Sequence, residues 1–349
     1  MAEEVIRFGL VGAGGIAQAY AQAFRDLKIA RLVGVADVNL AAARKLGEQI
    51  GCRSYDSYEA LGDEWPLDAV IICTPPVSHP EIALHFCQRK VHVLCEKPLS
   101  IDVSSAELML DTARRNSVKL TMASKFRYVE DVVRAKSIVR SGILGDILLV
   151  ENAFTSRIDM SERWNSQQEI SGGGVLIDNG THSVDIMRYF LGQLSDVQVI
   201  EGVRGHNLAV EETVQMFVRS TDGVLGRIDL SWSINKELES YINIHGTKGT
   251  VVVGWKASKY RQNTSSEWIV FGNGYDKVQA FRSNIINFCG GIRGEEALLV
   301  TQQDAIASVE VIEAAYTALG RNQWSKVSHA LDQNYLRLVD QETPLRKIA

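Results

Sequence analysis

Two side chains capable of acid–base chemistry stand four residues apart, just after three consecutive glycines. Asp178 and His182 follow Gly172–Gly174, and residues at this spacing share one face of a helix. A carboxylate beside an imidazole can fix its orientation and raise its pKa, which suits general acid–base work. The glycines permit unusual backbone geometry and close approach of a ligand. A capping Asp and a core His would give the same pattern. No metal site is predicted, because a second His or Cys is not nearby.

A lysine follows a segment that is typical of a buried strand. Lys97 comes directly after His92–Glu96 and before Pro98. Open α/β sheets bind ligands outside the carboxyl ends of their strands. At such a position, an ammonium could hydrogen-bond a substrate oxygen and stabilise developing negative charge. A solvated surface lysine is the alternative interpretation, and the sequence leaves open whether the Lys97–Pro98 bond is cis.

The strongest local motif is GAGGIA at residues 12–17, a GxGxxA pattern directly after an apolar run. Such glycines allow a tight turn and close approach of the backbone to a pyrophosphate, which the amides of the next helix would bind. Asp37 lies 25 positions after Gly12, where a carboxylate accepts hydrogen bonds from ribose hydroxyls and repels a 2′-phosphate. NAD is therefore favoured over NADP, with a plain glycine turn and a surface Asp as the alternative. The residues predicted to bind NAD here are Gly12, Gly14, Gly15, Ile16 and Asp37.

The first 125 or so residues alternate short apolar runs with helical patterns, which indicates βαβ units. The runs are continuously apolar, as expected for strands with both faces covered. Helices are predicted between the runs, among them Ser78–Arg89 and Ser104–Asn116. The predicted strands are Val5–Val11, Arg31–Asp37, Gly51–Tyr55, Ala69–Thr74, His92–Glu96 and Lys119–Ala123. Residues 1–125 are thus predicted to form an α/β domain with a doubly wound parallel sheet.

The pattern changes from about Ile147, where β-rich runs arrive with short turns between them. This meander pattern predicts an α+β domain with a largely antiparallel sheet at 126–320, followed by a C-terminal extension at 321–349. The predicted strands are Ile147–Phe154, Val197–Glu201, Thr213–Arg219, Leu225–Ser233 and Ser240–Ile244. The predicted helices are Asp178–Leu191, Asp276–Phe288 and Thr301–Leu319, the last ending at Gly320.

Composition narrows the class of protein. The 349 residues are 46% hydrophobic and 23% charged, which is ordinary for a folded soluble chain with two domains. A net charge of −5 makes nucleic acid an improbable partner. No window approaches the roughly 18 apolar residues of a membrane span, and the first residues lack a secretory pattern. Five scattered cysteines indicate a reducing compartment, so we expect a cytoplasmic protein without membrane contacts.

Five motifs together carry a resemblance to a known family. The segments GLVGAGGIA, CTPPVSH, CEKPL, GGGVLIDNGTHSVD and IHGTKGT, in this order, resemble those of the Gfo/Idh/MocA family of glucose–fructose oxidoreductase and inositol dehydrogenase relatives. The likeness covers roughly residues 5–320. It implies a Rossmann domain, an open-faced mixed sheet, a nicotinamide cofactor, and sugars, cyclitols or their derivatives as substrates. It also implies a homodimer or homotetramer assembled through the C-terminal sheet.

The resemblance further implies roles for particular residues around the substrate. Lys97, Asp178 and His182 correspond to residues that commonly surround the reacting carbinol. Arg127 falls where members often carry an Asn-x-Arg-Phe-like stretch, which makes it a candidate substrate contact, although the Asn is absent. The polar loop before the glycines is a candidate pocket lining or a flexible surface loop. Its candidate residues are Arg157, Arg163, Trp164 and Asn165.

The cofactor side is implied by the same resemblance. Thr74 and Pro75, with His79 beyond them, match the family's T-P-x-x-x-H segment, which flanks the cofactor. Glu96 and Lys97 are expected to reach the cofactor from the end of the neighbouring strand.

These roles predict reversible oxidation of a ring secondary alcohol. His182 would take the hydroxyl proton, Lys97 would stabilise alkoxide character, and Asp178 would orient His182 or bind a neighbouring hydroxyl. Three alternatives stay open: an NAD-dependent glycosidase that uses transient oxidation, a ketoreductase for a nucleotide-linked sugar, and a non-catalytic sensor. Cations for a substrate diphosphate could come from Lys125, Arg127, Arg157 and Arg163.

Overall fold

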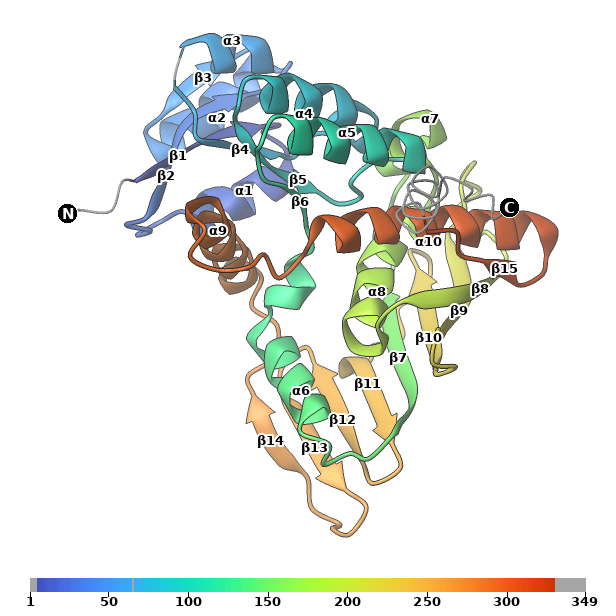
Figure 1. Ribbon diagram of the computed structural model, residues 1–349. Helices are drawn as coiled ribbons and strands as arrows, with labels where there is room; N and C mark the ends of the chain where they lie inside the picture. Colours follow the sequence, from blue (N-terminus) through green and yellow to red (C-terminus); the bar gives the residue numbers. More distant parts are fainter. Residues whose placement is uncertain (1–4, 65, 330–349) are drawn as a thin grey trace, which may run out of the picture.

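The computed structural model describes residues 5–64 and 66–329, which form two β-sheets with helices around and between them (Figure 1). The first sheet is wholly parallel, with strand order β3-β2-β1-β4-β5-β6. Its central strands are apolar and buried because helices cover both faces. The strands are β1 (Ile6–Val11), β2 (Ala30–Ala36), β3 (Arg53–Tyr55), β4 (Ala69–Ile72), β5 (His92–Glu96) and β6 (Leu120–Ala123).

Two separate cores hold the helices on this sheet. One core joins α1 (Gly15–Ala23) and α2 (Leu40–Ile50) to one face of the strands. The other joins α3 (Tyr58–Glu64), α4 (His79–Gln88) and α5 (Val103–Arg115) to the opposite face. Strand order and layering confirm the predicted doubly wound parallel sheet.

The second sheet has nine strands in the order β14-β13-β12-β11-β7-β10-β9-β8-β15. Among the described strands of this second sheet, only β7 and β10 pair in parallel, so the sheet is mixed and largely antiparallel, as predicted. The strands are β7 (Ile147–Thr155), β8 (Leu194–Glu201), β9 (Thr213–Ser220), β10 (Leu225–Ser231), β11 (Ser240–Gly246), β12 (Gly249–Gly254), β13 (Ser258–Gln262), β14 (Ile269–Gly272) and β15 (Ser325–Lys326).

Helices cover one face of the second sheet and then return to the first. Helices α6 (Glu130–Arg140) and α8 (Val175–Leu191) pack on the sheet around a common apolar core. Helix α9 (Lys277–Arg293) then lies against α1, and α10 (Gln302–Arg321) contacts both α8 and α5 (Figure 1). The second half of the chain therefore helps to cover the first sheet, and the two sheets are held side by side.

Several boundaries of the predicted elements are wrong by a few residues, among them the end of the last long helix. We predicted that the last long helix ends at Gly320, but α10 continues through Arg321. Asn322 ends it in the left-handed region at φ 52°, a conformation that Asn adopts at lower cost than most residues. Of the predicted extension, 330–349 lie outside the described residues.

Candidate active site

The glycine turn after β1 has the geometry that a dinucleotide needs. Gly12 has φ +97°, and a Cβ on it would lie 2.8 Å from the backbone of Cys73. A Cβ on Gly14 or Gly15 would meet nothing within 4 Å, so this side of the turn is open. Gly14 is the N-cap of α1 and has no side chain that could accept hydrogen bonds from the first amides of the helix. These amides are therefore left for a ligand.

Asp37 stands beside this turn at the end of β2. Its carboxylate accepts hydrogen bonds from the Ala13 amide at 2.7 Å and from the Asn39 amide at 2.8 Å. These bonds hold the carboxylate next to the glycine turn, where the ribose of a bound dinucleotide would lie. The open turn, the uncapped helix and the fixed carboxylate together fit NAD.

His79 plays a different part from the one we expected. The buried ring lies between two carbonyl oxygens, with Nδ1 2.9 Å from that of Pro98 and Nε2 2.9 Å from that of Thr74. It thus ties the loop after β4 to the loop after β5 and does not face a ligand. Thr74 itself lines the cavity described below, and Pro75 precedes a single 3-10 turn, η1 (Pro76–Ser78).

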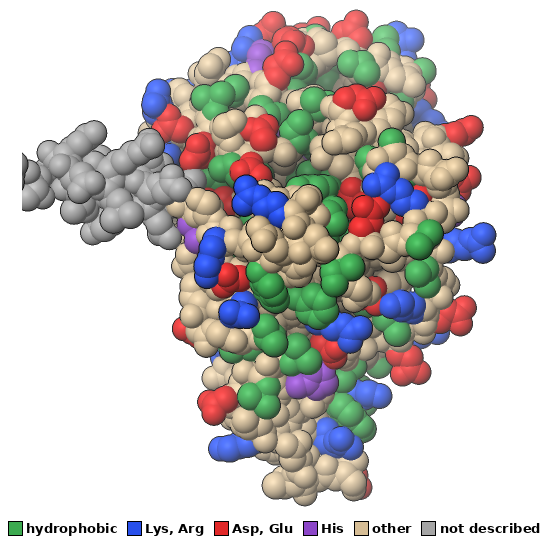
Figure 2. Space-filling view, turned by 90° about the vertical axis from the view of Figure 1, so that its right-hand side faces the viewer, with side chains coloured by type: hydrophobic (Ala, Val, Ile, Leu, Met, Phe, Trp, Pro, Cys, Tyr) green, Lys and Arg blue, Asp and Glu red, His purple; other side chains and the backbone are tan. Residues whose placement is uncertain are grey.

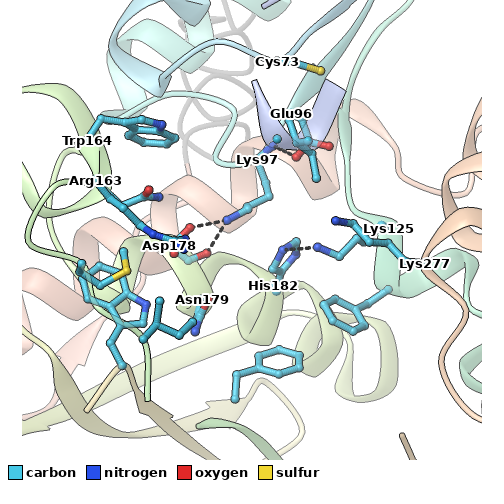
Figure 3. Close-up of a pocket in the computed structure, with 18 of the residues that line it drawn as sticks. Cys73, Glu96, Lys97, Lys125, Arg163, Trp164, Asp178, Asn179, His182 and Lys277 are labelled. Carbon is cyan, nitrogen blue, oxygen red and sulfur yellow. Dashed lines mark hydrogen bonds and ion pairs between the residues drawn. The ribbon is translucent and has the colours of Figure 1, made fainter. Parts of the chain in front are cut away.

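A cavity of about 560 Å³ lies where the carboxyl edge of the first sheet meets the second half of the chain (Figure 3). The first sheet contributes the ends of β4 and β5 and the start of α1. The second half contributes α8, the strand β7 and the segment that follows it, and the start of α9. Lining residues from the first half are Gly15, Ile16, Cys73, Thr74, Glu96, Lys97, Lys125 and Phe126. Those from the second are Phe154, Ile158, Met160, Arg163, Trp164, Asn165, Asp178, Asn179, His182, Trp232 and Lys277.

Lys97 and Asp178 form an ion pair across this cavity. The Lys97 ammonium donates to Asp178 Oδ1 at 2.6 Å and to the Asp178 carbonyl oxygen at 2.9 Å (Figure 3). The Lys97–Pro98 peptide bond is cis. Asp178 therefore fixes the position of the lysine, and its partner is Lys97 and not His182.

His182 lies one turn further along α8, beside a second lysine. Its Nε2 is 3.3 Å from the ammonium of Lys125, and the ring meets Phe126 edge-on at 5.0 Å. Burial, followed by the charges of Lys125 and Lys97, lowers the pKa of His182 well below its ordinary value. The expectation of a raised pKa is thus wrong, because the imidazole is buried and the described charges that act on it are those of two ammonium groups.

A carboxylate holds the start of α8, the helix that carries both residues. Glu211 Oε1 accepts hydrogen bonds from the Gly174 amide at 2.9 Å, the Leu176 amide at 3.1 Å and the Tyr316 hydroxyl at 2.8 Å. A Cβ on Gly173 would lie 1.8 Å from that hydroxyl, and one on Gly174 would lie 2.1 Å from the Glu211 carbonyl oxygen. These glycines therefore admit a neighbouring segment of the protein, where we had expected them to admit a ligand.

The loop before the glycines reaches the cavity with some of the residues proposed from the sequence. Arg163, Trp164 and Asn165 line the cavity (Figure 3), and Trp164 begins a short 3-10 turn, η3 (Trp164–Ser166). Arg157 is exposed and lies outside the lining. Its proposed role as a substrate contact is corrected, because its side chain is exposed to solvent and does not line the cavity.

Arg127 is also absent from the cavity lining. It is buried, with Nε 2.9 Å from Asp185 Oδ2, Nη2 2.8 Å from Asp185 Oδ1 and Nη1 3.1 Å from Asp304 Oδ2. These pairs join the turn η2 (Lys125–Tyr128) to α8 and α10. The proposed substrate contact is corrected, because the guanidinium is buried and forms ion pairs with two carboxylates inside the protein.

We expect Arg127→Met to lower the free energy of unfolding by about 3–5 kcal/mol, because it leaves a buried carboxylate without its cation. Urea denaturation followed by circular dichroism measures this change. Arg157→Met removes an exposed cation and should stay within about 0.5 kcal/mol of wild type. Unchanged stability of Arg127→Met together with a raised substrate KM would restore the substrate role.

Sequence reasoning gave little weight to two of the cations that reach the cavity. Lys125 lies two residues after the end of β6, so the rule about the carboxyl ends of parallel strands would have found it. Lys277 starts α9, more than a hundred residues from the other cavity lysines. No local signal marks it, because only the packing of α9 on α1 brings it there.

Comparison with known proteins agrees with this geometry. A model of the oxidoreductase family with an NAD-binding Rossmann fold matches residues 6–124, and the GFO/IDH/MocA C-terminal domain matches residues 132–252. The chain belongs to the Gfo/Idh/MocA oxidoreductase family. This family member is accordingly an oxidoreductase with an NAD-binding domain.

Characterised relatives of this family member span almost its whole length. It is 27% identical to glucose-6-phosphate 3-dehydrogenase of Bacillus subtilis, over 92% of this chain and 99% of the relative. It is 26% identical to inositol 2-dehydrogenase of Rhizobium meliloti, over 91% of this chain and 98% of the relative. The solved structure of levoglucosan dehydrogenase with NADH has the same fold, with a TM-score of 0.86 and 20% sequence identity. The match covers 93% of this chain and 100% of that structure's chain.

Two further structural findings concern other kinds of site. None of the helices in the described part of the chain combines the length and apolar character that crossing a bilayer requires. Within residues 5–64 and 66–329, no three or more His, Cys, Asp or Glu side chains are grouped to hold a metal ion.

Proposed function

We propose that this chain oxidises a secondary alcohol on the ring of a sugar, cyclitol or sugar derivative, with NAD as the hydride acceptor. The proposal is carried by the meeting of Lys97, Asp178 and His182 in one cavity beside the NAD-binding edge. The inositol and glucose-6-phosphate dehydrogenases among its relatives support this substrate class.

Each of these side chains has its own role in the proposed reaction. NAD, when bound, supplies the carbon that takes the hydride. An ammonium has three hydrogens, and the contacts of Lys97 with Asp178 use two, which leaves one for the carbinol oxygen. That hydrogen bond stabilises the negative charge that develops on the oxygen. The imidazole of His182 is neutral because its pKa is lowered, so Nε2 can take the hydroxyl proton.

The test is NADH formation with a panel of inositols, free hexoses, sugar acids and sugar nucleotides. We expect oxidation of at least one ring alcohol, with one NADH formed for each carbonyl. Cleavage of a glycoside without net NADH would instead establish the glycosidase. NAD binding without oxidation of any compound in the panel would overturn the proposal in favour of a sensor.

We expect the wild type to prefer NAD to NADP by at least about tenfold in kcat/KM, because Asp37 repels a 2′-phosphate. Replacement of Asp37 by serine should narrow this preference by raising kcat/KM with NADP. Initial rates with both cofactors measure the change. Equal efficiency of the wild type with NAD and NADP would contradict the role of Asp37.

We also propose that the chain assembles as a homodimer or homotetramer through the face of the second sheet opposite α6 and α8. Ile200, Phe217 and Leu225 alternate with core residues and lie on this face, with Ile200 52% and Leu225 44% exposed. Figure 2 shows the side of the molecule where β8–β10 lie, with hydrophobic side chains gathered among charged ones. Sedimentation equilibrium tests the proposal, and a monomer at micromolar concentration would overturn it.

A further inference from the structure

The cavity holds more positive than negative side chains. Four cations line it, Lys97, Lys125, Arg163 and Lys277, against the two carboxylates Glu96 and Asp178. Both carboxylates are engaged: Asp178 holds Lys97, and Glu96 accepts from the Tyr20 hydroxyl at 2.8 Å and from the Lys97 amide at 3.2 Å. A bound dinucleotide and a neutral sugar do not account for this excess of positive charge at the end of the cavity where the alcohol would react.

Lys125 lies beside the proposed base, His182, and it forms no ion pair with a carboxylate among the described residues. Its ammonium lies 3.3 Å from His182 Nε2 and over the rings of Phe126 and Phe281, at 5.2 and 5.9 Å from their centroids. Aromatic faces stabilise a cation only modestly. The ammonium therefore has hydrogen-bonding capacity left for an anion that enters the cavity.

Lys277 stands next to it from another part of the chain. Figure 3 shows Lys125 and Lys277 side by side, on the side of His182 away from Asp178. The charge of Lys277 is one of those that depress the pKa of Lys125, to about 8, after burial and the charge of Lys97. No described carboxylate lies within ion-pair distance of Lys277, so two neighbouring cations share one side of the cavity.

We propose that Lys125 and Lys277 bind a carboxylate or phosphate group of the substrate, so that the enzyme acts on acidic sugars or cyclitols. The inference rests on the proposed function and specifies its substrate class. The amides of the α1 turn provide for the cofactor's pyrophosphate. An anion bound by Lys125, by contrast, would lie within reach of the imidazole that takes the hydroxyl proton. Such an anion would therefore belong to the molecule that is oxidised.

The test compares matched neutral and acidic compounds: glucose, glucuronate and glucose 6-phosphate, and inositol with inositol 1-phosphate. We expect kcat/KM for the acidic member to exceed that for the neutral one by about 10- to 100-fold, the range that charge-assisted hydrogen bonds supply. The carboxylate and phosphate arms show which anion is preferred. Equal values for neutral and acidic members would overturn the inference and leave the proposed dehydrogenase intact.

Variants distinguish whether the two lysines bind the anionic group of the substrate or the phosphates of the cofactor. Lys125→Met and Lys277→Met should each lower the acidic-to-neutral ratio about tenfold, and Lys125→Arg should restore part of it. Lys248→Met, in the exposed turn between β11 and β12, is the matched control and should leave the ratio unchanged. If Lys277→Met weakens NADH binding, measured by fluorescence, without changing the ratio, Lys277 serves the cofactor and the two-lysine site is overturned.

Binding and pH give two readouts that do not depend on the size of the rate. Calorimetry with the NAD-saturated protein should show glucuronate binding that Lys125→Met weakens; unchanged binding would overturn the inference even if no compound were oxidised. The groups that face Lys125 are Glu96 at the end of β5, Lys97 just after it, Asp178 and His182 on α8, and Lys277 on α9. Lys125 loses its charge as pH rises through about 8, so the acidic-to-neutral ratio should fall across that pH.

Discussion

Replacing His182 by asparagine is expected to lower kcat for alcohol oxidation by roughly 10²–10⁴-fold, because the hydroxyl proton loses its acceptor. Asparagine keeps a polar side chain in the cavity but cannot take up a proton. Steady-state rates with the best substrate of the panel measure the loss. The matched control is His85→Asn on α4, outside the cavity lining, which should retain wild-type kcat.

The lowered pKa of His182 also predicts how kcat/KM changes with pH. The pKa of His182 is lowered by burial and by Lys125 and Lys97, so the neutral form persists below the usual range of histidine. On the acidic side, kcat/KM of the wild type should therefore fall when the pH drops through that lowered pKa. The asparagine variant should lack this acidic limb. A near wild-type kcat in the variant would show that another group takes the proton.

Replacing Lys97 by methionine is expected to lower kcat/KM by roughly 10²–10³-fold, the usual cost of removing one donor to a developing oxyanion. Methionine preserves most of the side-chain length, so the loss reports the missing charge and hydrogen bond. Asp178 loses its partner at the same time. Lys45→Met, on the exposed side of α2, is the control for a simple loss of charge.

The coupling between Lys97 and Asp178 can be measured in the same experiment. If Asp178 acts by holding Lys97, then Asp178→Asn should cost much less in the Lys97→Met background than in the wild type. Fully additive losses in kcat/KM would indicate that Asp178 contacts the substrate independently. A near wild-type kcat/KM for Lys97→Met would remove the lysine from the mechanism.

The sequence predicted the first sheet well because its signals are local. A GxGxxA turn after β1, an Asp after β2 and continuously apolar strands each follow from short-range sterics and burial. The second sheet was predicted less completely: β12, β13 and β14 were missing from the predicted strands, and β13 and β14 carry exposed residues that gave no clear pattern. Helix α6 was missed for a similar reason, since few of its residues are buried.

The candidate site shows the same division. The sequence by itself predicted Lys97, Asp178 and His182 as candidates for the chemistry, through their types and spacing, and all three line one cavity. It could not assign their partners, since the contacts of Asp178 with Lys97 and of His182 with Lys125 join residues at least 57 positions apart. It likewise placed Arg127 against a substrate, where the fold surrounds it with two carboxylates.

What only the tertiary structure decided is the electrostatics of the cavity. Local sequence places a carboxylate one helical turn from the imidazole and suggests a raised pKa. The packing of α8 against the ends of β5 and β6 instead brings two ammonium groups to the site, and α9 adds a third. Charge interactions depend on distance and burial, and long-range contacts between elements set both.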